Sequence, residues 1–133
     1  MKRLLFIIAM LVATACHAGE TVVFDFYADW CGPCVQMKPV VERVRASGYD
    51  IRTINVDEQY KSVKVGDEMY RYGHLQHVWD VHTIPCVIVA RESNRAGEVG
   101  VLISSPADKH VGGMSAAQLV SFLKSRGVKP EEK

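Results

Sequence analysis

The sequence has no excess of charge of either sign, because 16 lysine and arginine residues stand against 15 aspartate and glutamate residues. A balanced chain of this kind lacks the basic surface that nucleic acids require, so we expect no nucleic-acid partner. Internal repeats, low-complexity tracts and a linker rich in proline, glycine or serine are also missing. The 133 residues are therefore enough for one domain with a modest core.

Cysteine is scarce, and its spacing argues against a structural metal site. Of the four cysteines, Cys31 and Cys34 are three positions apart, whereas Cys16 and Cys86 each stand alone. Structural zinc needs four ligands, commonly a second Cys-x-x-Cys or a pair of histidines. We therefore expect neither zinc nor copper, and no organic cofactor, because a dithiol pair carries two electrons by itself.

The cysteine pair lies between two segments whose apolar residues are spaced differently. Residues 21–27 are rich in β-branched and aromatic side chains, which predicts a strand, and apolar residues at helical spacing follow over 33–46. The pair is therefore expected at an exposed strand-to-helix turn. Gly32 lets another backbone approach closely, and Pro33 suits a first helical turn, where its missing N–H is not needed.

A place at the start of a helix distinguishes the two thiols chemically. Unsatisfied backbone N–H groups and the helix dipole favour an anion there, so we expect Cys31 to be the nucleophilic thiolate. Cys34, one turn further into the helix, is the expected resolving thiol, which attacks the mixed disulfide between Cys31 and a substrate. The spacing therefore predicts thiol–disulfide exchange.

Asp25 is the other candidate catalytic residue. It lies between Phe24 and Phe26 in the predicted strand, and strand alternation turns it to the face opposite the two rings. On an exposed face Asp25 would be an ordinary polar residue. On a face covered by a helix, desolvation would raise its pKa and make it a proton acceptor from Cys34.

The segment Phe24-Asp25-Phe26-Tyr27-Ala28-Asp29-Trp30-Cys31-Gly32-Pro33-Cys34 closely resembles the active-site segment of thioredoxins. The resemblance resumes at Thr83-Ile84-Pro85 and at Val111-Gly112-Gly113-Met114-Ser115. It implies a thioredoxin fold, a thiol:disulfide oxidoreductase activity on protein disulfides or dithiols, and a buried, proton-carrying Asp25. It also implies a cis Ile84–Pro85 bond and a substrate surface made by Trp30, Gly32, Pro33, Ile84, Pro85 and Gly112.

The periodicity predicts an α/β architecture. We expect a mixed sheet of about four strands flanked by helices, with strands at 21–27, 51–56, 86–91 and 98–104 and helices at 33–46, 66–80 and 115–126. Compared with thioredoxins, this minimal version lacks the usual first strand and helix, and Thr53 stands where a lysine often neighbours the buried aspartate.

The chain also has an insertion between Asp57 and Pro85 relative to thioredoxins. Met69, Tyr72 and Trp79 follow a helical period within it, which predicts an extended connecting helix over 66–80. The alternatives for the insertion are a longer packed helix or a partner-specific wall beside the active site.

Cys86 directly follows Pro85 and begins an apolar run, Cys86-Val87-Ile88-Val89-Ala90. Free cysteine often behaves as a small buried hydrophobe, so we expect a buried thiol; a third redox thiol is the alternative. His82 lies just before the Thr83-Ile84-Pro85 segment, where it is either a solvated residue or a contact to substrate.

The N-terminus has the pattern of a secretory signal peptide. Two basic residues within 1–3 precede an apolar stretch over 4–15, which is too short to span a bilayer, and small residues follow. We therefore expect a signal peptide over 1–18, with cleavage after Ala18 or, as a second candidate, Ala15, and a thioredoxin-like domain over 19–133. The alternative is a lipid anchor on Cys16. Either way the protein is expected in the periplasm or otherwise exported.

Export means that the cysteine pair needs an external source of electrons or of oxidant, because disulfides persist in an oxidising compartment unless something reduces them. The Gly-Pro dipeptide between the cysteines and Ile84 before the proline resemble the reducing members of the family. We therefore expect a monomeric protein-disulfide reductase that receives electrons from a membrane-bound thiol donor. The alternatives are a disulfide oxidase or isomerase that uses the same thiols, and a thioredoxin-fold binding or assembly module.

Overall fold

The structure is a computed structural model that describes residues 20–93, 95–98 and 100–131. The predicted signal peptide and Cys16 lie outside the described residues, so the division of the chain at residue 18 stays a prediction. In the part that is described, no helix has the length and apolar character needed to cross a membrane.

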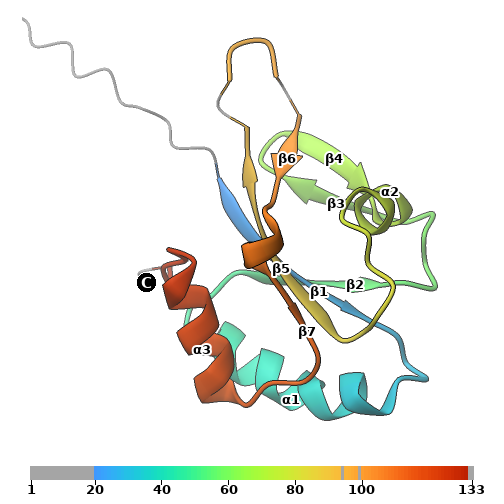
Figure 1. Cartoon of the computed structure of the whole chain (residues 1–133), viewed down its shortest axis with the longest axis vertical. Helices are drawn as coiled ribbons and strands as arrows, with labels where there is room; N and C mark the ends of the chain where they lie inside the picture. Colours follow the sequence, from blue (N-terminus) through green and yellow to red (C-terminus); the bar gives the residue numbers. More distant parts are fainter. Residues whose placement is uncertain (1–19, 94, 99, 132–133) are drawn as a thin grey trace, which may run out of the picture.

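A five-stranded mixed sheet organises the domain (Figure 1). Strand β1 (Thr21–Tyr27) pairs in parallel with β2 (Ile51–Asn55) on one side and antiparallel with β5 (Cys86–Glu92) on the other. On its far side β5 pairs with two short antiparallel strands, β6 (Leu102–Ile103) and β7 (Lys109–Val111). The predicted strands at 21–27, 51–56 and 86–91 are confirmed to within one residue at each end.

Two helices lie together on one face of this sheet (Figure 1). Helix α1 (Gly32–Ala46) joins β1 to β2, which is the crossover that a parallel pair requires. Helix α3 (Ala116–Ser125) begins with a capping box, in which Ser115 accepts from the Gln118 N–H while Gln118 accepts from the Ser115 N–H. The helices predicted over 33–46 and 115–126 are confirmed.

Side chains that alternate along the strands divide the core into two halves. The half beneath α1 and α3 is formed chiefly by Val23, Val87, Val89, Met37, Val41, Val44, Leu119 and Leu123. The half on the opposite face is formed chiefly by Phe24, Phe26, Ile54, Ile88, Val65, Tyr70, Leu75 and Val81. Asp25 lies on β1 between the two phenylalanines, and so its side chain turns toward the half covered by α1.

The extended connecting helix over 66–80 is wrong. A β-hairpin of β3 (Ser62–Val65) and β4 (Glu68–Arg71) occupies its first part, and only a seven-residue helix, α2 (Tyr72–Val78), follows. Gly66 at the hairpin turn has φ +59°, which breaks a helix. Met69, which a helical period would bury, is 62% exposed, whereas Tyr70 is 7% exposed.

The hairpin and α2 cover the face of the sheet opposite α1 and α3 (Figure 1). Their buried side chains fill the space over Phe24 and Phe26, and Trp79 packs against both rings at centroid distances of 5.6 and 6.4 Å. The insertion is therefore a packed layer of the fold.

The expected sheet of about four strands is confirmed, because β6 and β7 pair with different parts of β5 and the sheet is four strands wide. The expected single strand over 98–104 is wrong: of the described residues in that range only Leu102–Ile103 form a strand, β6, and a 3-10 turn at Pro106–Asp108 separates it from β7. Pro106 has no N–H to donate to a ladder, and the Asp108 carboxylate accepts hydrogen bonds from the N–H and hydroxyl of Ser105, which closes the turn. Strand β1 is the first element of the described residues, and the expected lack of an earlier strand and helix concerns residues outside them.

Candidate active site

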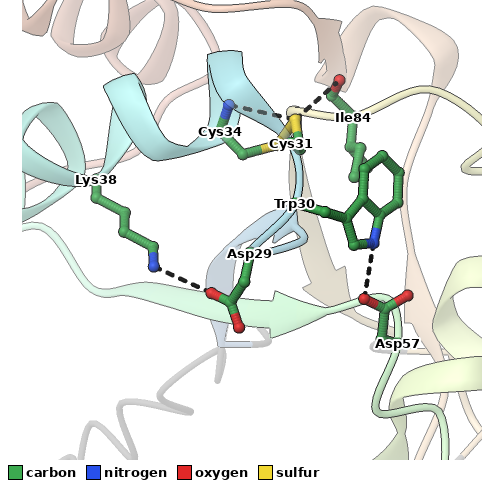
Figure 2. The surroundings of a disulfide bond; sticks show 7 residues. All are labelled: Asp29, Trp30, Cys31, Cys34, Lys38, Asp57 and Ile84. Carbon is green, nitrogen blue, oxygen red and sulfur yellow. Dashed lines mark hydrogen bonds and ion pairs between the residues drawn. A yellow bond between two sulfur atoms is a disulfide. The ribbon is translucent and has the colours of Figure 1, made fainter.

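Cys31 and Cys34 form a disulfide at the start of α1 (Figure 2). Their Cα atoms are 5.2 Å apart. Cys31 is the N-cap residue of the helix, and its Sγ accepts a hydrogen bond from the Cys34 N–H at 3.3 Å. The Cys34 N–H therefore points toward the Cys31 sulfur, where it and the helix dipole stabilise negative charge.

The loop before β5 brings distant residues to this disulfide. The Ile84–Pro85 peptide bond is cis, and the Ile84 carbonyl oxygen lies 3.8 Å from the Cys31 Sγ (Figure 2). Gly112, just after β7, donates its N–H to the Pro85 carbonyl at 2.8 Å. Gly112 has φ +105°, a backbone conformation that favours glycine. The fold thus joins four of the expected site residues, which come from three separate segments.

Three more expected site residues lie at the turn into α1. Trp30 is 71% exposed, and its ring is held by a hydrogen bond from Nε1 to Asp57 Oδ2 at 2.8 Å (Figure 2). Gly32 and Pro33 are exposed at the helix start, and a Cβ added at Gly32 would meet nothing within 4 Å. Another chain can therefore approach the disulfide closely from this side. Sequence reasoning did not single out Asp57, because its carboxylate reaches Trp30 only through the fold.

Asp25 is on a covered face, so its interpretation as an exposed polar residue is wrong. The side chain is 5% exposed, and its Oδ1 has no hydrogen-bond partner among the described residues. Burial raises the pKa of Asp25 to about 7, and the charge of Arg45 opposes this effect. A carboxyl group with such a pKa exchanges its proton near neutral pH, as a proton carrier must.

A cavity of about 270 Å³ connects Asp25 to the surface. It is lined by Asp25, Tyr27, Lys38, Val41, Glu42 and Thr53, of which Lys38, Glu42 and Thr53 are exposed. Sequence reasoning noted Thr53 but missed Lys38 and Glu42. The available signal was their spacing: Lys38 follows Cys34 by four residues and Glu42 follows Lys38 by four, and residues four apart lie on one face of a helix.

Cys86 is fully buried, as expected, and lies in the half of the core opposite α1 and α3. Burial raises the pKa of its thiol to about 11, so it is not a ready nucleophile. The His82 ring contacts the exposed Asp80 carboxylate and is itself exposed. Among residues 20–93, 95–98 and 100–131, no three His, Cys, Asp or Glu side chains gather in a way that could hold a metal ion.

Comparison with known proteins places this arrangement in a family. The family model described as thioredoxin matches residues 12–125 of the chain. The chain belongs to the thioredoxin family. A thioredoxin of Chlamydia pneumoniae is 30% identical over 84 residues, which cover 62% of this chain and 70% of that protein. The thioredoxin-like protein slr0233 of Synechocystis is 27% identical over 104 residues, which cover 78% of this chain and 79% of the relative.

Solved thioredoxin structures share the fold. The thioredoxin of Trichomonas vaginalis aligns with a TM-score of 0.55 at 18% identity and covers 81% of each chain. The oxidised thioredoxin of Plasmodium falciparum aligns with a TM-score of 0.53 at 20% identity, covering 81% of this chain and 82% of its own. Thioredoxin family membership and the Cys31–Cys34 disulfide together make the protein a thiol:disulfide oxidoreductase, and the family implies protein disulfides as substrates.

Proposed function

We propose that the protein is an exported reductase of protein disulfides. The Cys31 thiolate attacks one sulfur of a substrate disulfide and forms a mixed disulfide, and the first substrate thiolate leaves. Cys34 then attacks the Cys31 sulfur, which forms the Cys31–Cys34 disulfide and releases the second substrate thiolate. The substrate gains two electrons, and the protein dithiol is oxidised by two.

The place of the Cys31 sulfur is the observation that carries this proposal. The sulfur caps α1 and lies 3.8 Å from the Ile84 carbonyl, beside the turn that exposes Trp30, Gly32 and Pro33. Cys31 is itself 6% exposed but borders the exposed Gly32 and Pro33, so a substrate can approach its sulfur over that turn, which supports its role as the nucleophile. Cys34 is only 2% exposed, which supports its role in the second, internal attack.

Substrate recognition is assigned to the surface around this sulfur. The hydrogen bond from the Gly112 N–H to the Pro85 carbonyl joins the Ile84–Pro85 segment to Gly112 beside the Cys31 sulfur. We infer that an extended substrate segment lies along this backbone with its disulfide at Cys31, while the Trp30 ring provides apolar contact.

Asp25 is proposed to receive the proton of the Cys34 thiol. The Cys34 thiol must lose its proton before it can attack, and a carboxyl group whose pKa burial raises to about 7 can accept that proton at neutral pH. The 270 Å³ cavity then lets the proton pass from Asp25 to solvent.

Export and the direction of electron flow belong to the same proposal. The basic and apolar pattern of residues 1–18 supports secretion, and a reductase in an oxidising compartment needs a thiol donor, which we place in the membrane. The sequence of the motif around the cysteines supports reduction. Oxidation or isomerisation with the same thiols is the alternative. About 30 mV in redox potential corresponds to only 1.4 kcal/mol, so one or two different contacts to the Cys31 sulfur are enough to reverse the direction of electron flow.

Cysteine variants test the activity. With dithiothreitol as electron source and a disulfide-bonded protein as substrate, we expect Cys31→Ser to abolish reduction without trapping substrate. Prereduced Cys34→Ser, mixed with the substrate after dithiothreitol is removed, should accumulate a mixed disulfide between Cys31 and the substrate, detected by mass spectrometry, because the resolving step is lost. Cys86→Ala is the matched control and should keep the activity. Full function of a Cys31→Ser, Cys34→Ser double variant would instead favour a binding or assembly module.

The redox potential of the pair tests the direction. We expect equilibration with dithiothreitol and glutathione buffers to give a value near that of thioredoxin, about −270 mV. A value near about −120 mV would make the protein a disulfide donor. Cell fractionation and the mass of the mature N-terminus test the exported location and the cut after Ala18.

A further inference from the structure

Lys38 is the exposed cation at the Asp25 cavity. Its Nζ donates to Asp29 Oδ1 at 3.1 Å and lies 5.5 Å from the centroid of the Tyr27 ring (Figure 2 shows the pair with Asp29). Tyr27 lines the cavity on the same face of β1 as Asp25, two residues further along the strand. Strand geometry separates such residues by about 7 Å. Lys38 and Asp25 line the same cavity, so a rotation of the flexible lysine stem turns its ammonium group from Asp29 into that cavity.

The contact between Lys38 and Asp29 does not hold the lysine firmly. The two side chains are 52% and 72% exposed, and exposed ion pairs of this kind are weak because water screens them. The Asp25 carboxylate, in contrast, is buried and its Oδ1 accepts no hydrogen bond from any described residue. An ionised Asp25 is therefore the stronger attractor for the ammonium group.

The other groups around Asp25 do not offer a movable positive charge. They are Glu42 and Arg45 on α1, Tyr27 on β1 and Cys86 on β5. Arg45 donates to the Ile51 carbonyl at 2.7 and 3.1 Å and to Glu42 Oε1 at 3.1 Å. Its guanidinium is thus held by three hydrogen bonds, whereas Thr53, the lining residue from β2, is uncharged.

We propose that Lys38 is a positioning residue, which moves from Asp29 to Asp25 when Asp25 ionises and so holds the Asp25 carboxylate for proton transfer from Cys34. The proposal rests on the proposed function of Asp25. Cys34 and Lys38 are four residues apart on one face of α1, so the lysine enters the cavity one turn from the thiol.

Atoms and charges balance in this transfer. The Cys34 S–H bond breaks and its proton passes to the Asp25 carboxylate. The Cys34 thiolate then attacks the Cys31 sulfur, the Cys31–Cys34 bond forms, the bond between Cys31 and the substrate breaks, and the substrate thiolate leaves. Asp25 is then neutral, so Lys38 returns to Asp29. When Asp25 gives its proton to solvent through the cavity, the lysine moves back. The two positions of Lys38 thus follow the two charge states of Asp25.

The test is a titration of the Asp25 carboxyl carbon by ¹³C NMR in the full chain with the cysteine pair reduced. We expect Lys38→Met to weaken the acidity of Asp25 by roughly tenfold, because an opposite charge that comes within about 4–6 Å of a carboxyl group lowers its pKa by about one pH unit or more. Lys38→Arg should retain the wild-type midpoint. Lys64→Met, an exposed lysine on β3, is the matched control and should titrate as wild type.

Asp29→Asn supplies the opposite perturbation. It frees Lys38, so we expect Asp25 to become more acidic, and this effect should vanish when Lys38→Met is also present. An Asp25 midpoint that does not respond to Lys38→Met, or an Asp29→Asn effect that persists without Lys38, overturns the proposal. A protein that fails to reduce disulfides overturns the proposed function instead, because the carboxyl titration needs no turnover.

Discussion

Replacing Asp25 by asparagine should stabilise the folded protein at neutral and alkaline pH. Burial raises the pKa of Asp25 from 3.8 to about 7, while the charge of Arg45 opposes this. The difference is about three pH units at about 1.4 kcal/mol each, so the ionised carboxylate destabilises the folded state by about 4 kcal/mol. An asparagine side chain has nearly the same shape as aspartate and carries no charge, so the Asp25→Asn variant avoids this cost.

The sign of the pH dependence follows from proton binding. Between pH 3.8 and about 7 the folded state holds the Asp25 proton and the unfolded chain has lost it. The stability that this proton provides is therefore complete below pH 3.8 and is lost as the pH rises through this window. The advantage of Asp25→Asn over wild type should grow from about 1 kcal/mol at about pH 4.5 to about 4 kcal/mol at about pH 8.

Urea unfolding of the oxidised protein, followed by circular dichroism from about pH 4.5 to about pH 8.5, measures this difference. Asp67→Asn is the control, because Asp67 is an exposed residue in the β3–β4 turn. Its effect should stay within about 0.5 kcal/mol at every pH, as surface substitutions usually do. A gain for Asp25→Asn that does not change with pH, or a loss in alkaline buffer, would refute the reasoning about burial.

Three further predictions concern residues outside the proton path. Cys86 is fully buried, and burial raises the pKa of its thiol to about 11. Iodoacetamide at about pH 7.5 should therefore modify Cys31 in the reduced native protein and spare Cys86 until urea is added, as measured by mass spectrometry of peptides. Rapid modification of Cys86 in the native protein would contradict its burial. Gly112→Ala should lower the free energy of unfolding by about 1–2 kcal/mol, because Gly112 has φ +105°. Gly113→Ala, the control, should lower it by less. Equal losses for the two variants in urea unfolding would contradict the backbone argument. The Tyr70 hydroxyl is buried and has no hydrogen-bond partner in the described part of the chain. Tyr70→Phe should therefore leave the stability unchanged or raise it by about 1 kcal/mol in thermal unfolding. A clear loss of stability would contradict this and reveal a partner of the hydroxyl.

Local patterns in the sequence were enough for the elements that carry the cysteines. The β-branched and aromatic run of β1 and the apolar period of α1 predicted both elements to within one residue. Helix capping is also local, so Cys31 could be placed at the N-terminus of α1 before the structure was known. These features depend only on residues that are close in the chain.

The insertion shows where such reasoning fails. Residues 66–80 have apolar side chains at spacings that suit a helix, but Gly66 lies at a hairpin turn and the buried Tyr70 pairs with Val63 on the neighbouring strand. The period was ambiguous over so short a stretch. Tertiary packing decided it, because side chains of the hairpin and α2 pack in one cluster with Phe24 and Phe26.

Residue order alone therefore specified the chemistry of this protein: a cysteine pair at a strand-to-helix turn, and a pattern of residues shared with thioredoxins. The environment of that chemistry came from the tertiary fold. The burial of Asp25, the cavity that Lys38 borders, and the meeting of Cys31 with Ile84 arise from contacts between segments far apart in the chain. Desolvation and long-range electrostatic contacts depend on which surfaces pack together, and residue periodicity does not specify that choice.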